Sequence, residues 1–343
     1  MKNMRSKTKG AALLLGLALT AGAARTQSLD IPSKTWGLSF GNSKEFSGLR
    51  FNFRDSQVKY VKGITVTLWQ PRKDNDESII TGLSLGVIPG GGHLRGVQIG
   101  LLGIAGSRSV TGISLAALGV GAGDDLTGIN IAGLGMGAGK NMAGFNIAGL
   151  GMGAGENLSG VNIAGLGMGA GKNMEGINIA GLGLGGSGDV TGINIAGLGA
   201  GTGKNMTGLN IAGLGLGAGE NLSGINISGL GMGAGKVLAG LNIAGLAVGS
   251  PEIRGLTIAG GVVGGEILKG LQIAGGMVYV PKEGSFTGGA VSPFNYIRGS
   301  QTGVTIGIVN YAWSVKGVQL GLVNIVRDNP AGLKVLPVFN TSF

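Results

Sequence analysis

The stretch Gly-Ile-Asn-Ile-Ala-Gly-Leu-Gly-Met-Gly-Ala-Gly-Lys-Asn-Met-Ala occupies residues 128–143 and returns, with few changes, every 16 residues. The regular copies begin at Gly144, Gly160, Gly176, Gly192, Gly208 and Gly224. Looser copies begin at Gly82, Gly96 and Gly112 on one side and at Gly240, Gly255 and Gly270 on the other. A fixed period of this length indicates a repeat architecture in which each unit stacks on its neighbours. One module therefore organises residues 82–276.

Each repeat is predicted to be β rather than helical. β-branched residues alternate with polar ones between glycines, and so many glycines would cost a helix several kcal/mol. Numbered from the first glycine, large apolar residues stand at positions 2, 4, 7, 9 and 15. One straight strand cannot place all five on one side. A coil that turns at Ala-Gly, at Gly-Lys-Asn and at the next initial glycine can point them all inward. The favoured fold is an all-β solenoid with one repeat per coil.

An alternative all-β fold is an up-and-down antiparallel meander that closes as an outer-membrane-type barrel. The C-terminal Phe343 is typical of such barrels, although the repeats lack their aromatic girdles. The charges before the repeat asparagines alternate in sign and fit both folds. In a stack they form opposite-charge neighbours, and in a meander they separate onto two rims. These residues are Arg108, Asp124, Lys140, Glu156, Lys172, Asp189, Lys204, Glu220, Lys236 and Glu252.

The flanks of the array are predicted to be less regular. Residues 25–81 form a capping region in which residues 36–70 resemble hairpins, with Leu49, Phe51 and Phe53 on one face and Arg50, Asn52 and Arg54 on the other. Residues 277–343 hold degenerate repeats. Residues 71–78 and 281–301 are predicted loops, where specific contacts are expected if the chain makes any.

Composition excludes most catalytic chemistry. The 343 residues include 76 glycines and only 12% charged residues, with no cysteine and a single histidine, His93. Thiolate chemistry and histidine clusters are therefore impossible. The glycine-rich segment ending at Lys140 lacks the glycine and the Ser or Thr of a phosphate-binding loop. We predict no enzyme activity and no catalytic, cofactor-binding or metal-binding residues, and no nucleic-acid partner.

An asparagine column at position 3 is the one candidate interaction surface. It comprises Asn130, Asn146, Asn162, Asn178, Asn194, Asn210, Asn226 and Asn242. A regular row of amides could bind a glycan, a mineral or a partner sheet. The favoured interpretation is structural: stacked asparagines that hydrogen-bond to one another as an amide ladder.

The N-terminus is typical of a secretory signal peptide. Lys2, Arg5, Lys7 and Lys9 precede an apolar run over residues 11–21, and small residues follow. The run is too short to span a bilayer as a helix. Cleavage near residue 24 would leave 22 basic against 16 acidic residues, a net charge of +6. We predict export to the bacterial envelope, as an outer-membrane, cell-surface or secreted protein.

The repeats resemble bacterial glycine-rich surface-repeat proteins. The resemblance is carried by the Gly-Ile-Asn-Ile-Ala-Gly-Leu units and by Gly-Val-Thr-Ile-Gly-Ile-Val-Asn (303–310) and Gly-Val-Gln-Leu-Gly-Leu-Val-Asn (317–324). It implies an exported surface protein without assigned enzymatic activity. Members of this kind are often lipoproteins, whereas this chain has no cysteine to acylate. The predicted function is a structural scaffold or adhesin-like interaction module, with self-association, envelope components or a membrane as possible partners. The alternative function is a barrel-type pore or anchor.

Overall fold

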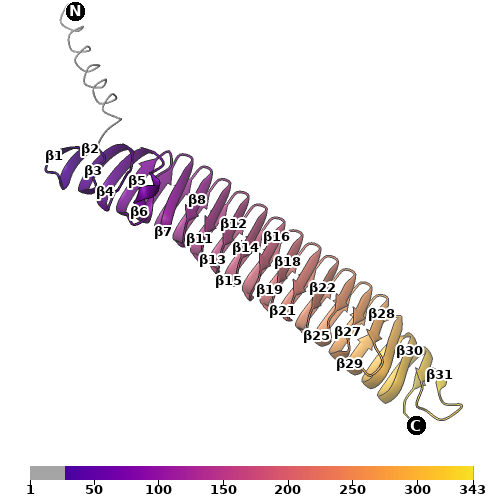
Figure 1. The fold of residues 1–343 in the computed structure, drawn as a ribbon. Coiled ribbons are helices and arrows are strands. Elements are labelled where there is room, and N and C mark those ends of the chain that lie inside the picture. Colours follow the sequence, from indigo (N-terminus) through magenta and orange to yellow (C-terminus); the bar gives the residue numbers. More distant parts are fainter. Residues whose placement is uncertain (1–27, 343) are drawn as a thin grey trace, which may run out of the picture.

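The chain folds as a long rod of stacked β-coils (Figure 1). The computed structural model describes residues 28–342. Strand accounts for 72% of the structure, in a β-solenoid of about 16 turns. Coils spaced by about 4.8 Å give a rod roughly 75 Å long. The solenoid predicted from the repeat is confirmed.

Each coil of the central array has one long strand and one short strand. The long-strand side of the rod contains β2 (Trp36–Gly41), β3 (Glu45–Arg54), β4 (Tyr60–Trp69), β5 (Ile79–Gly86), β6 (Gly90–Gly100), β7 (Gly103–Ala116), β9 (Asp125–Ala132), β11 (Met142–Ala148), β13 (Leu158–Ala164), β15 (Met174–Ala180), β17 (Val190–Ala196), β19 (Met206–Ala212), β21 (Asn221–Ser228), β23 (Val237–Ala244), β25 (Glu252–Ala259), β27 (Ile267–Ala274), β29 (Ser285–Val291) and β30 (Phe294–Val326). The short strands are β8 (Gly119–Ala122), β10 (Gly135–Ala138), β12 (Gly151–Ala154), β14 (Gly167–Ala170), β16 (Gly183–Gly186), β18 (Gly199–Thr202), β20 (Gly215–Ala218), β22 (Gly231–Ala234), β24 (Ala247–Gly249), β26 (Val262–Gly264) and β28 (Met277–Val280). The longest segments, β7 and β30, also contribute to the short-strand side.

Neighbouring coils pair in parallel and in register. Residue 146 lies beside residues 130 and 162, and the short strands match in the same way. Parallel pairing runs without interruption from β2 to β30. The alternative antiparallel meander, closed as a barrel, is therefore wrong.

The interior differs from the predicted set of inward positions. Positions 9 and 15 are buried as predicted, for example Met152 and Leu158. Positions 2, 4 and 7 face outward, and position 7 is exposed in every coil from Leu102 to Leu246. Their places inside are taken by the asparagine at position 3 and by small residues at positions 5 and 11, such as Ala148 and Ala154. The interior thus combines large residues at positions 9 and 15 with small residues at positions 5 and 11. This combination suits a flattened coil with two closely spaced walls.

Three glycine columns are favoured by the backbone of the coil, and only the first of them is constant in every coil. The position 1 glycines have φ between 100° and 143° in every coil from Gly37 to Gly317, a backbone conformation that side chains disfavour. At positions 6 and 12, for example Gly149 and Gly155, an added Cβ would collide with the carbonyl of the preceding coil. Positions 8 and 10 differ, because a Cβ at Gly151 or Gly153 would lie 3.4 Å or 3.9 Å from its nearest neighbour.

The flanks continue the solenoid instead of forming hairpins. Over residues 36–70, β2, β3 and β4 stack in parallel, so the predicted hairpins are wrong. The two predicted faces are present there: Arg50 and Asn52 lie inside, while Phe51 and Phe53 are exposed. True antiparallel pairs occur only at the two described ends, where β1 (Ser28–Pro32) pairs with β2 and β31 (Val335–Asn340) pairs with β30.

Only one of the two predicted loops is irregular. Residues 71–78 leave the coil and include the short 3-10 helix η1 (Lys73–Asn75). Residues 281–301 instead contain β29 and the start of β30, which pair with the coils beside them. The prediction of a loop there is wrong because turn residues such as Pro281 and Pro293 occupy tight corners between strands.

Candidate functional site

The asparagine column lies inside the rod, so it cannot act as an interaction surface. All eight side chains, from Asn130 to Asn242, are 0% exposed. Each Nδ2 donates to the Oδ1 of the asparagine one coil further on, at 2.8–2.9 Å, from the Asn130–Asn146 pair to the Asn226–Asn242 pair. The amide ladder is confirmed, and the surface interpretation of the same residues is wrong.

The ladder is part of a longer polar column. Asn242 is followed in register by Thr257 and Gln272, and Asn130 is preceded by Ser114 and Gln98. All are buried. Within the asparagine ladder, buried amides are tolerated because in-register stacking supplies partners, whereas an unpaired buried amide would cost about 1–3 kcal/mol. This column stabilises the interior and leaves recognition to the outer surface.

The outer surface carries an apolar face along the whole array. We define the apolar face as the outward side chains at positions 2, 4 and 7. Representative exposed members are Ile129 at position 2 and Ile131 at position 4, which are 44% and 38% exposed. Position 7 forms an unbroken leucine edge, 39–59% exposed, made of Leu102, Leu118, Leu134, Leu150, Leu166, Leu182, Leu198, Leu214, Leu230 and Leu246. This face was missed because large apolar residues were assigned to the interior.

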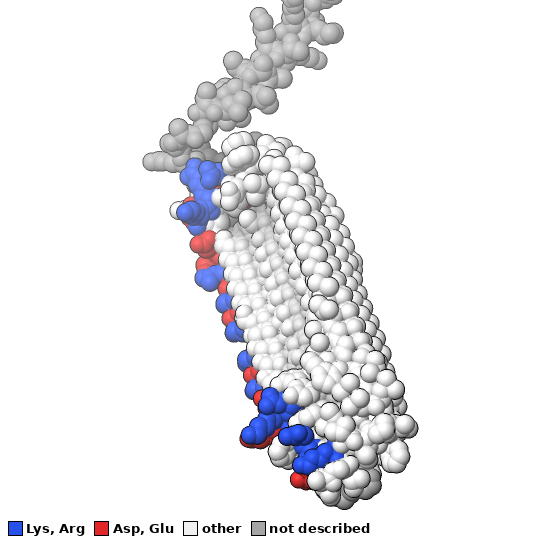
Figure 2. Space-filling model, turned by 90° about the vertical axis from the view of Figure 1, so that its right-hand side faces the viewer, with Lys and Arg blue, Asp and Glu red and all other residues white. Residues whose placement is uncertain are grey.

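The charges gather on one edge of the rod (Figure 2). Most charged residues of the central array are corner residues at position 13, where opposite charges meet one coil apart. Lys172 Nζ lies 2.8 Å from Glu156 Oε2, Lys236 Nζ lies 2.8 Å from Glu220 Oε2, and Lys140 Nζ lies 3.0 Å from Asp124 Oδ1. The stacked opposite pairs predicted from the alternating signs are confirmed at these coils.

Asp189 does not belong to the charged column. Its carboxylate accepts a hydrogen bond from Asn205 Nδ2 at 2.8 Å, and its backbone N–H donates to Asn173 Oδ1 at 3.0 Å. It therefore lies in the neighbouring column of corner asparagines at position 14, where Asn157 donates to Asn141 at 2.9 Å. Gly188 occupies the corner position instead. The assignment of Asp189 to the alternating series is wrong by one residue. The same is true of Glu252, which lies in register with Val237 at position 14 and pairs with Arg254 and Lys269.

Hydrogen bonds between side chains at the charged edge shift the pKa values of several of its residues. The hydrogen bond with Lys140 lowers the pKa of Asp124, and the same contact raises the pKa of Lys140. Further along, hydrogen bonds from Arg254 and Lys269 lower the pKa of Glu252 to about 2. These groups are held charged by their neighbours, which is a structural role.

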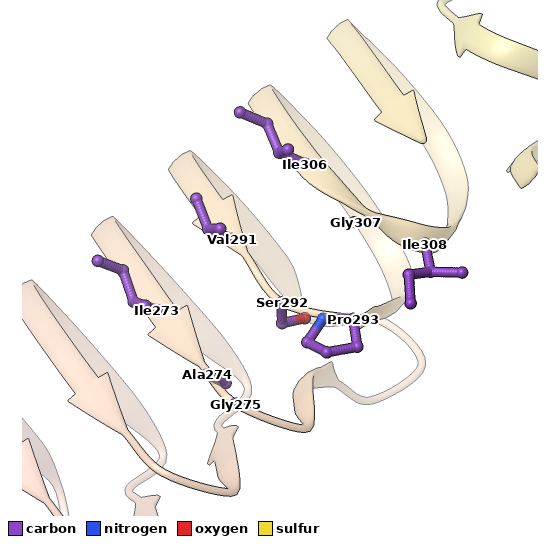
Figure 3. A pocket seen from close by; sticks show the side chains of 9 residues that line it. All are labelled: Ile273, Ala274, Gly275, Val291, Ser292, Pro293, Ile306, Gly307 and Ile308. Atoms are coloured by element: carbon purple, nitrogen blue, oxygen red, sulfur yellow. The ribbon is translucent and has the colours of Figure 1, made fainter. Parts of the chain in front are cut away.

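A shallow apolar depression opens where the leucine edge ends. Its volume is about 360 Å³. Ile273, Val291 and Ile306 line it from successive strands at position 4, together with Pro293 at a turn and Ile308 within β30 (Figure 3). Its walls carry no charged side chain. It therefore extends the apolar face toward the C-terminal end.

A second depression, of about 560 Å³, lies beside η1. Its rim includes Lys44, Lys59, Asp74 and Asp76. Nearby side chains pair with each other: Lys44 Nζ donates to Gln57 Oε1 at 2.7 Å, and Lys59 Nζ lies 3.0 Å from Glu45 Oε1. The predicted loop at 71–78 thus contributes to this polar depression. Because its rim carries both positive and negative side chains, the charges do not indicate which class of ligand would bind.

The N-terminal coils contain a buried ion pair inside the rod. Arg50 occupies the same interior column as the asparagines, and its Nη2 lies 2.6 Å from Asp55 Oδ1, with both side chains almost completely buried. Asn52 donates to the same oxygen at 2.6 Å, and Thr67 donates to Asp55 Oδ2 at 3.3 Å. Both oxygens of the Asp55 carboxylate therefore accept hydrogen bonds from side chains inside the rod.

Two further features concern residues 28–342 only. No group of three or more His, Asp or Glu side chains in this range is placed to hold a metal ion. No helix in the same range has both the length and the hydrophobicity to cross a membrane. The predicted signal peptide, residues 1–24, lies outside the described residues.

Comparisons of the chain with models of protein families, with curated proteins and with solved structures found no match.

Proposed function

We propose that this chain is an exported, non-enzymatic rod that serves as a scaffold and interaction module of a bacterial cell envelope. The observation that carries the proposal is the apolar face, which continues over ten coils from Leu102 to Leu246. Exposed apolar patches on soluble monomers rarely exceed a few hundred Å², and larger ones mark contact sites. A long contact surface on a stiff rod suits assembly.

The rod is built to hold its surface in a fixed geometry. Parallel backbone hydrogen bonds tie each coil to the next. The buried amide ladder adds to them from Asn130 to Asn242, and ion pairs at the charged edge join some of the coils. Such one-dimensional stacks spread a binding surface over many identical units. This arrangement supports a structural role.

Export is supported by the sequence. The basic residues, apolar run and small residues of positions 1–24 have the order of a secretory signal peptide. The resemblance to bacterial glycine-rich surface-repeat proteins supports the same location. A pore function is not proposed, because it depended on the antiparallel barrel.

The test is to express the full chain in a Gram-negative bacterium and to measure its intact mass and its location. We expect loss of about 24 N-terminal residues, recovery in the envelope or medium, and digestion by protease added to intact cells if the rod is displayed. A Leu14→Arg, Leu17→Arg variant, which interrupts the apolar run, should keep its N-terminus and remain in the cytosol. Cytosolic wild-type protein with an intact N-terminus would contradict the proposal.

A further inference from the structure

The apolar face raises the question of what covers it. It spans positions 2 to 7, about 17 Å along the coil at roughly 3.3 Å per residue. Ten coils at about 4.8 Å extend it over about 48 Å. Because the coil bends at positions 6 and 7, the footprint has an upper limit of roughly 800 Å², which is about the area that each partner buries in a stable protein interface.

A lipid surface is a poor match for the apolar face. Structures that lie on membranes place lysine and arginine beside the apolar surface to attract anionic headgroups. Here the charged edge alternates in sign, with Lys140, Glu156 and Lys172 on successive coils. The outward position 16 beside position 2 is mostly neutral, as at Ser159 and Thr191. No basic strip flanks the face.

A second copy of the chain matches the face in spacing and in chemistry. Its side chains repeat once per coil on both copies, so the ridges of one rod can fit between those of the other over the whole length. The face carries no charge that such contact would bury. Positions 8 and 10 beside the leucine edge are glycines, for example Gly151 and Gly153, so no side chain on this flank stands in the way of a close approach.

The coil itself does not require those flanking glycines. The same outward columns hold Val262, Met277 and Tyr279 in later coils, which keep the same register. Larger side chains are thus compatible with the fold and are absent only beside the leucine edge. This supports close approach of a flat partner there.

We propose that two copies of this chain associate side by side through the apolar face, with the leucine edge and the glycines beside it included in the contact. The proposal names a partner for the interaction role proposed above and rests on that role. It does not depend on where the protein is located. The export assay and the association assay therefore fail independently.

The test uses full-length chain purified after expression, examined by sedimentation velocity and equilibrium over a range of concentrations. We expect a dimer whose affinity changes little with salt, since the contact is apolar. The variant Leu150→Lys, Leu166→Glu, Leu182→Lys copies onto the leucine edge the alternating charges that the opposite edge already tolerates. It should fold normally by circular dichroism and weaken the dimer at least about 100-fold.

A matched control places the same charges elsewhere. The variant Thr191→Lys, Thr207→Glu, Ser223→Lys alters outward position 16, away from the leucine edge, and should remain dimeric. A monomeric wild-type chain at all concentrations would overturn the proposal, as would wild-type affinity in the leucine-edge variant. Neutral lipid vesicles that bind the wild-type rod while it stays monomeric would overturn it in favour of a lipid surface.

Discussion

The central coils and the terminal coils share one backbone but differ in almost every side chain. Between residues 119 and 249 the interior column is asparagine, the corner is leucine and the short strands are glycine-rich. In the N-terminal coils the interior column holds Arg50 and Thr65, and toward the C-terminus it holds Thr257 and Gln272. Only the position 1 glycine, with its positive φ, persists throughout. The coil therefore requires a few glycines and leaves the other positions free for additional roles.

The largest effect should come from a required glycine. In Gly176→Ala the new Cβ would collide with the carbonyl oxygen of Gly160, and residue 176 would also have to keep a φ of 108°, which side chains disfavour. We expect a loss of about 4 kcal/mol or more in the free energy of unfolding. Gly185→Ala is the matched control, because its Cβ would lie 3.9 Å from the nearest atom, and we expect unchanged or slightly higher stability. Denaturant unfolding followed by circular dichroism measures both, and equal losses would refute the distinction between the glycine columns.

The second prediction concerns the buried Arg50–Asp55 ion pair inside the N-terminal coils. Asp55→Ala leaves the buried Arg50 guanidinium without its carboxylate. Removing one partner of a buried ion pair costs about 3–5 kcal/mol. We expect hydrogen exchange to accelerate in β3 and β4 while the central coils remain protected. Uniform loss of protection along the rod would show that the ends and the centre unfold together.

The third prediction compares a substitution in the asparagine ladder with one in the polar column that continues it. Asn178→Val leaves a donor on Asn162 and an acceptor on Asn194 unpaired inside the rod, which should cost about 2–3 kcal/mol. Thr257→Val removes a weaker contact, since Asn242 Nδ2 is 3.4 Å from Thr257 Oγ1. Thermal unfolding should therefore show a clearly smaller loss for Thr257→Val. A reversed order would mean that the amide ladder contributes little.

The smallest effect concerns pH at the charged edge. Hydrogen bonds from Arg254 and Lys269 lower the pKa of Glu252 from 4.5 to about 2. A carboxyl group with a lowered folded-state pKa stabilises the fold above its ordinary pKa, and this contribution is lost as pH falls from about 4.5 toward 2. Glu252→Gln should thus be less stable than wild type at neutral pH, and the difference should shrink across that window. Unfolding midpoints at several pH values measure it, and a constant difference would argue against the ion-pair contribution.

The repeat predicted the solenoid because a strict period leaves few ways to stack parallel coils in register. It also predicted the amide ladder, since identical asparagines fall one coil apart. The outward direction of the side chains at positions 2, 4 and 7 was not predicted, because hydrophobicity alone placed Ile129 and Leu134 inside. The narrow interior accepts a hydrogen-bonded amide and small alanines more readily than branched chains at every position. The Arg50–Asp55 pair could not be foreseen, since the spacing of the two residues follows no repeat.

The two antiparallel ends have a consequence for how such a protein can change over evolutionary time. Because β1 covers the first coil and β31 covers the last, the described rod shows no open parallel edge at which further copies would add. Each inner coil pairs only with the coil before it and the coil after it. In-frame gain or loss of a single repeat by recombination therefore changes the reach of the rod by about 4.8 Å and leaves both ends intact. Recombination can therefore lengthen or shorten the rod in uniform steps of one coil.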